Sequence, residues 1–160
     1  MKKFIVFAVS LSLIICFAGC GNRNQNVVNE VTDPPDSIID GKDDLERNMK
    51  FYIGDREIPV VWEDNESVYA LMEAVSEHEI TVKMSMYSNN EQVGPLGRSY
   101  VSSDVQMTTH NGDIVLYNSC NIVVFYGSNT WAYTKLGKMQ LSENEVTELL
   151  AHGDVIVKLN

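Results

Sequence analysis

Two apolar runs joined by a short connection restrict the folds open to this chain more than any other feature. Residues 113–117 read DIVLY and residues 121–126 read NIVVFY. Alternation puts Ile114 and Leu116 on one face of the first run and Val115 on the other, so both faces are apolar. A hairpin with two apolar faces is expected at the centre of a sheet and covered on both sides.

Further strand-like runs lie on either side of this hairpin. MKFYI and IPVVW flank a Gly-Asp turn, which predicts a hairpin with Pro59 at a sheet edge. ITVKMSMY, residues 80–87, alternates apolar and polar side chains and predicts a half-buried strand. DVIVKL predicts a last strand, whereas residues 88–113 are rich in Asn, Gly and Ser and predict mainly loop.

Two segments have the period of a helix. The first carries apolar residues at helical spacing: Val68, Leu71, Met72 and Val75. Asp64 or Asn65 is its expected N-cap. In the second, Ser142 and Glu145 form a capping box before an apolar stripe, and Gly153 ends the helix. This order favours a closed antiparallel sheet capped by two short helices over a doubly wound parallel sheet.

The first nineteen residues have the pattern of an export signal. Lys2 and Lys3 precede an apolar stretch at residues 4–17, and small residues follow. An uncleaved anchor helix is the alternative, although the roughly 20 residues that a span needs are barely present. Residues 20–47 are rich in Asn, Asp, Gly and Pro and predict a flexible, acidic tether. One folded domain at residues 48–160 remains.

The segment FAGC, which ends at Cys20, resembles the lipobox of bacterial lipoproteins. That resemblance implies that Cys20 becomes the first mature residue and carries lipid. Each buried CH₂ contributes about 0.8 kcal/mol to membrane attachment. Cys16 leaves with the signal, so Cys120 is the one free thiol, and neither an intramolecular disulfide nor a cysteine-rich metal site is expected.

The charge of the chain argues against two kinds of partner. Its formal net charge is −10, and removal of Lys2 and Lys3 with the signal makes it −12. Nucleic acid is an unsuitable partner, because binding it requires Lys and Arg to displace counterions. Anionic lipid would also repel the chain, so membrane attachment would rest on the acyl chains, at the extracytoplasmic face of the cell membrane.

The order of elements and several strings resemble the bacterial cyclophilin-like domain family. The strings are GPLGRSY, GDIVLY and IVVFYGSNTWAYTKLGKM, followed by a helix and a strand. The resemblance covers residues 48–160 and implies an eight-stranded β-barrel closed by two helices. True cyclophilins are prolyl isomerases with signatures similar to FHRVI and SQFFI, and neither string occurs here. No catalytic residue is therefore assigned, and isomerase activity is kept as the alternative function.

The preferred hypothesis for the function of the domain is a binding module, with a peptide or small molecule as its ligand. Its candidate binding residues lie in GRSY and YGSNTWAY: Arg98, Tyr100, Tyr126, Asn129, Trp131 and Tyr133. Arg98 would meet a carboxylate or carbonyl, and the aromatic rings would form apolar walls. For Trp131 and Tyr133, however, a purely structural role is favoured over ligand binding, since cross-strand aromatics stabilise sheets without a ligand.

The remaining expectations concern the turn and the absence of cofactors. Gly127, Ser128 and Asn129 predict a turn with positive φ. No phosphate-binding glycine loop, metal-ligand spacing or Ser-His-Asp order occurs, so neither a cofactor nor a metal is expected.

Overall fold

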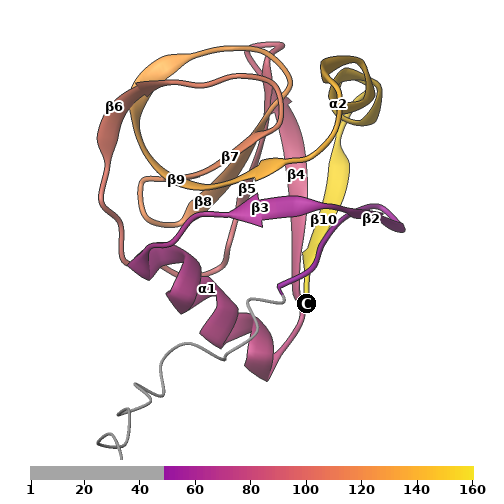
Figure 1. Ribbon diagram of the computed structural model, residues 1–160. Coiled ribbons are helices and arrows are strands. Elements are labelled where there is room, and N and C mark those ends of the chain that lie inside the picture. The colour runs from indigo at the N-terminus through magenta and orange to yellow at the C-terminus, as the bar shows by residue number, and fades with distance from the viewer. Residues whose placement is uncertain (1–48) are drawn as a thin grey trace, which may run out of the picture. The chain divides into compact units, whose positions relative to one another are not determined.

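The computed structural model describes residues 49–160, which form an antiparallel β-barrel with two helices (Figure 1). The predicted signal peptide, Cys20 and the tether lie outside the described residues. The elements are β1 (Phe51–Ile53), β2 (Arg56–Ile58), β3 (Val60–Trp62), α1 (Glu66–Glu77), β4 (Ile80–Tyr87), β5 (Glu91–Pro95), β6 (Val105–Thr108), β7 (Asp113–Tyr117), β8 (Asn121–Phe125), β9 (Thr130–Met139), α2 (Glu143–Leu150) and β10 (Val155–Leu159).

The sheet order explains how the barrel nearly closes. Nine strands follow one another as β2-β1-β10-β4-β5-β8-β7-β9-β3, and β6 pairs with residues 130–133 at the start of β9. The end strands β2 and β3 are consecutive in the chain and are separated by Pro59 alone. Because proline has no N–H to continue a ladder, it divides one apolar run into two strands. The family resemblance implied eight strands, and this division contributes to the larger number.

The hairpin of β7 and β8 is central, as its two apolar faces predicted. It lies between β5 and β9, and residues 113–116 and 122–125 are all buried. Its inner face packs in the barrel core, which includes Ile114, Leu116 and Phe51. Its outer face forms a second, smaller cluster made of Val115, Val123, Phe125 and Tyr133. This outer cluster underlies the candidate site.

Both predicted helices are confirmed, and they lie at different ends of the barrel (Figure 1). The side chain of Asn65 caps α1 by accepting from the N–H of Val68. Ser142 and Glu145 form the expected capping box of α2. Within residues 49–160, neither helix combines the length and the apolar character needed to cross a bilayer.

Residues 88–113 are mainly loop, as expected, but the expectation missed two strands there, β5 and β6. β5 reads EQVGP, and its polar, glycine and proline residues are those that usually indicate a loop. Gly94 is needed there because an added Cβ would lie 2.4 Å from Cγ1 of Val82 and 2.8 Å from the carbonyl oxygen of Lys83. β5 therefore approaches β4 more closely than a larger residue would allow.

The expected positive φ at Gly127, Ser128 and Asn129 was wrong. The non-glycine residues with positive φ are in the β4–β5 and β7–β8 turns, at Ser88, Asn89, Asn118 and Ser119. Gly127 is instead a point of close approach, because an added Cβ would lie 2.7 Å from Cβ of Asn90. Two hydrogen bonds stabilise this close contact between Asn90 and the segment around Gly127. The Tyr126 N–H donates to the Asn90 carbonyl, and the Asn90 side-chain amide donates to the Ser128 carbonyl.

Candidate functional site

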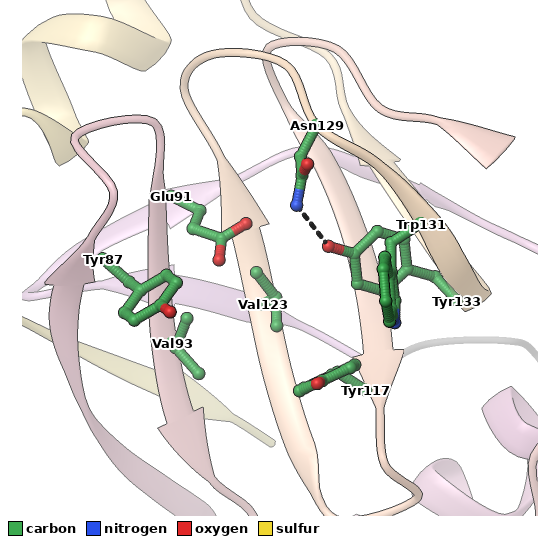
Figure 2. A pocket seen from close by; sticks show the side chains of 8 residues that line it. All are labelled: Tyr87, Glu91, Val93, Tyr117, Val123, Asn129, Trp131 and Tyr133. Atoms are coloured by element: carbon green, nitrogen blue, oxygen red, sulfur yellow. Dashed lines mark hydrogen bonds between the residues drawn. The ribbon is translucent and has the colours of Figure 1, made fainter.

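An aromatic cavity of about 440 Å³ opens on the outer face of the barrel wall formed by β5, β8, β7 and β9. Its size falls within the range of small-ligand pockets. Eight residues line it (Figure 2): Tyr87, Glu91, Val93, Tyr117, Val123, Asn129, Trp131 and Tyr133. The site is thus built on strands of the barrel wall and on the connections between them.

Strand alternation decides which side chains of β5 reach the cavity. Glu91 and Val93 point outward, and Val93 lies opposite Val123 of β8. Gln92 points inward and is fully buried, where its amide donates to the carbonyls of Leu150 and Gly153 at 2.7 Å each. These bonds fix β5 to the end of α2 and thereby fix the direction of Glu91.

The floor of the cavity is a rigid aromatic cluster centred on Tyr133. Its ring lies edge-on to Tyr117 at 5.8 Å and to Phe125 at 5.7 Å between ring centroids. Such edge-to-face pairs contribute about 0.5–1.5 kcal/mol each beyond their buried area. Tyr133 is only 4% exposed, so its position is determined by packing within the sheet.

Asn129 joins this floor to the loop before β7. Its side-chain amide donates to the Tyr133 hydroxyl at 2.9 Å (Figure 2). Its backbone exchanges hydrogen bonds with Thr109, whose N–H donates to the Asn129 carbonyl at 2.8 Å. Asn129 is therefore a positioning residue for the Tyr133 hydroxyl.

The rim carries two exposed aromatic side chains on opposite sides of the floor. Tyr87, at the end of β4, is 64% exposed, and Trp131, on β9, is 56% exposed. Figure 2 shows their rings flanking the space above Val123 and Tyr117. Trp131 pairs in register with Met107 of β6, and none of the aromatic ring pairs formed by residues 49–160 includes it.

Glu91 is the one acidic residue of the cavity lining. Its side chain is held at the start of β5, between Tyr87 of β4 and Phe125 of β8 in the ladder. The residue is 5% exposed, and its Oε2 has no hydrogen-bond partner. Burial raises the pKa of its carboxyl. No ion pair among residues 49–160 includes Glu91.

The electrostatic effect of Glu91 extends to neighbouring phenols. Burial raises the pKa of Tyr133, and the negative charge of Glu91 raises it further. The pKa of Tyr126 is raised by the same two causes in the same order. Both phenols therefore stay protonated at neutral pH and can donate hydrogen bonds.

Asp113 shows how the same domain stabilises another buried acid. It is 4% exposed, and Lys138 lies 3.1 Å from its Oδ1. Its Oδ2 accepts from the N–H of His110 at 2.8 Å. Buried carboxylates are ordinarily paired in this way. Of these two buried carboxylates, only Glu91 has an oxygen without a partner. Three uncharged buried atoms outside the cavity lining also lack one: Asn90 Oδ1, Gln92 Oε1 and the Tyr126 hydroxyl.

The structure brings three of the six predicted ligand residues together: Asn129, Trp131 and Tyr133 all line the cavity. Arg98 does not line it; its guanidinium carbon lies 4.8 Å from the centre of the Tyr100 ring. Tyr100 and Tyr126 are buried in the barrel core, 7% and 8% exposed.

Five lining residues were not anticipated: Tyr87, Glu91, Val93, Tyr117 and Val123. Three of them lie on β4 and β5, on either side of the turn at Ser88 and Asn89. The pair of Asn residues at 89–90 after an alternating strand was a usable hairpin signal. Pairing β5 with β4 and β8 would then have placed Glu91 beside the aromatic strands.

Metal binding has no support in the described part of the chain. No group of three or more His, Cys, Asp or Glu side chains within residues 49–160 could hold an ion. The side chains that line the cavity supply one carboxylate, phenol hydroxyls, an amide, an indole and apolar walls.

The sequence comparison agrees with this architecture. A model of the cyclophilin-like family matches residues 51–160. The chain belongs to this family. No significant match is found among curated proteins or solved structures. The cyclophilin-like domain of this chain thus comprises the barrel and its two helices.

Proposed function

We propose that the cyclophilin-like domain is a non-enzymatic binding module, which takes a peptide or small ligand in the aromatic cavity. The observation that carries this proposal is the cavity itself, in which exposed rings surround a buried carboxylate oxygen that has no partner. Pockets with apolar walls and a few convergent polar groups are typical of ligand sites.

The two aromatic residues of β9 support the proposal differently. Tyr133 is explained by packing alone, because it is buried and contacts two other rings. Trp131 is more than half exposed and takes part in no ring pair within residues 49–160. An exposed indole on the rim of a cavity is better explained by a ligand than by sheet stability.

Prolyl isomerase activity is the alternative function, and no observation favours it. True cyclophilins present an arginine in their pocket, whereas the side chain of Arg98 lies over Tyr100 and outside the cavity lining. A protease-coupled isomerisation assay on the full-length chain should show no acceleration. Acceleration that is lost in Arg98→Ala would instead support catalysis.

Ligand binding is testable through the emission of Trp131. Trp62→Phe leaves Trp131 as the only tryptophan, since the chain has two. A screen of peptides and small molecules against this variant should find compounds that change its emission saturably. The change should disappear in Tyr133→Leu, which removes the cavity floor.

Trp131→Leu tests the role of the indole itself. This variant should bind none of the compounds when binding is measured by calorimetry, and it should keep the thermal midpoint of the wild type. A large decrease in the thermal midpoint of Trp131→Leu, together with a screen in which no compound changes Trp131 emission, would indicate a structural role for Trp131.

We infer from the leader and from the segment FAGC that Cys20 is lipidated and holds the domain at the extracytoplasmic face of the membrane. Cells fed labelled palmitate should yield labelled wild-type protein, and Cys20→Ser should lose the label. Cys120→Ser is the matched control and should keep it. Equal labelling of wild type and Cys20→Ser would contradict lipidation at this position.

A further inference from the structure

The unpartnered carboxylate restricts the chemistry of the ligand. Glu91 is 5% exposed and lies in the cavity lining with Oε2 unpaired. Burying a carboxylate without a partner costs free energy, which the same domain avoids at Asp113 by pairing it with Lys138. Figure 2 shows the Glu91 carboxylate pointing from β5 across the cavity, toward the side that carries Asn129 and Tyr133. A ligand that supplied the missing donor would remove this cost.

We propose that the ligand is an organic cation with N–H groups, a primary ammonium or a guanidinium on an apolar stem, whose nitrogen donates to the Glu91 carboxylate. This inference rests on the proposed binding function and specifies its ligand class. An ionised acceptor forms its strongest hydrogen bonds with charged nitrogen donors. A quaternary ammonium fits less well, because it has no N–H to donate to the carboxylate.

The aromatic walls suit the same ligand. Tyr87 and Trp131 flank the entrance to the cavity and Tyr117 lies in its floor, and the faces of such rings attract cations within about 6 Å. Val93 and Val123 form apolar wall beside them, which an alkyl stem can contact. A carboxylate, aromatic rings and an aliphatic wall together match the three parts of a lysine-like side chain.

The charge of the chain also favours a cation. With the signal removed, the formal charge is −12, so the mature chain attracts cations and repels anions. No cationic side chain lines the cavity, so nothing there competes for the carboxylate. An anionic ligand would meet Glu91 without any compensating charge from the lining.

The test compares an amine with its neutral isostere. Full-length Trp62→Phe in a non-ionic detergent is titrated at pH 7 with N-acetyl-lysine-methylamide and with N-acetyl-norleucine-methylamide, and Trp131 emission is followed. From the efficiency usual for small ligands, the amine should bind with a dissociation constant on the order of 1 mM. The neutral probe should bind on the order of tenfold more weakly, and Glu91→Gln should remove the difference between the two probes.

Matched variants distinguish charge from shape. Glu91→Asp keeps the charge on a shorter stem and should retain part of the preference for the amine, whereas Glu91→Gln keeps the shape without the charge. Arg98→Ala should leave amine affinity unchanged, because Arg98 is outside the cavity lining. Circular dichroism spectra of all variants show whether each is folded. The corresponding trimethyllysine probe should bind more weakly than the amine.

Two sources could present this chemistry, a free amine or a basic side chain of a peptide. Tighter binding of a capped Ala-Lys-Ala peptide than of pentylamine would indicate a peptide source, and the reverse order a free amine. Equal response to the lysine and norleucine probes would overturn the inference while leaving the proposed binding function intact. No response to any probe, at a probe concentration about tenfold above the expected dissociation constant, would overturn the inference. If no compound of the wider ligand screen changed Trp131 emission either, both the inference and the proposed binding function would be overturned.

Discussion

Replacing Glu91 with Gln is expected to raise the stability of the unliganded full-length chain at pH 7 by about 1 kcal/mol, or about 4 °C in thermal midpoint. The reason is that Glu91 is buried with Oε2 unpaired, and the amide removes the cost of burying its charge. Differential scanning calorimetry of wild type and variant measures the change. The same substitution should weaken amine binding, so stability and binding should change in opposite directions.

The effect should depend on pH with a defined sign. Burial raises the pKa of Glu91 in the folded state, so the folded chain holds its proton at a pH where the unfolded chain has released it. The wild type should therefore lose stability as pH rises from the ordinary glutamate range through the raised value. This contribution should be absent in Glu91→Gln. Burial and the charge of Glu91 raise the pKa of Tyr126 and Tyr133, so these two phenols remain neutral in that range. The other titratable groups of the cavity lining are Tyr87 and Tyr117.

Asp113 offers the matched control for this prediction. Its carboxylate is equally buried but accepts from His110 and pairs with Lys138. Asp113→Asn should lower the free energy of unfolding by about 1–3 kcal/mol, because Lys138 loses its anionic partner. If Glu91→Gln instead lowered the free energy of unfolding, as Asp113→Asn should, the Glu91 carboxylate would have to be stabilised by a partner. That result would contradict the unpaired state of Oε2.

The second large effect is expected from Gly94→Ala, which should lower the free energy of unfolding by about 3 kcal/mol. An added Cβ would lie 2.4 Å from Cγ1 of Val82, 2.8 Å from the carbonyl oxygen of Lys83 and 3.0 Å from Cγ of Met84. Relief requires β5 to move away from β4, which would also displace Glu91 and Val93 from the cavity. Urea titration followed by circular dichroism measures the loss.

A double substitution tests the cause of that loss. Val82→Ala removes the nearest methyl carbon, so Gly94→Ala should cost less in its presence, although the contact with the Lys83 backbone remains. Additive effects of the two substitutions would contradict the steric explanation. Unchanged stability of Gly94→Ala alone would show that β5 does not approach β4 as closely as described.

Local patterns predicted much of the barrel. The buried hairpin of β7 and β8 followed from two apolar faces, and both helices followed from spacing and caps at Asn65 and Ser142. The alternating strand β4 was likewise confirmed. In each case the signal is contained in a few neighbouring residues. Contacts distant in sequence were not needed to recognise these elements.

The candidate site depended on contacts that local patterns do not encode. β5 is a central strand that begins with two polar residues, and only its pairing with β4 and β8 buries Glu91 and Gln92. Asn129, Trp131 and Tyr133 were anticipated as candidates because they share one segment with an aromatic alternation. Arg98 drew attention as a lone cation in a loop, but the packing of its guanidinium on Tyr100 depends on tertiary structure.

The protonation of Glu91 tests the central claim most directly. Carbon-detected NMR of the labelled full-length chain can follow its side-chain carboxyl through a pH titration, with and without N-acetyl-lysine-methylamide. We expect a midpoint above the ordinary glutamate value of about 4.3 in the free protein, and a lower midpoint when the amine is saturating. An ordinary or lowered midpoint in the free protein, unchanged by the amine, would contradict a cavity that holds an unpaired carboxylate for a cationic ligand.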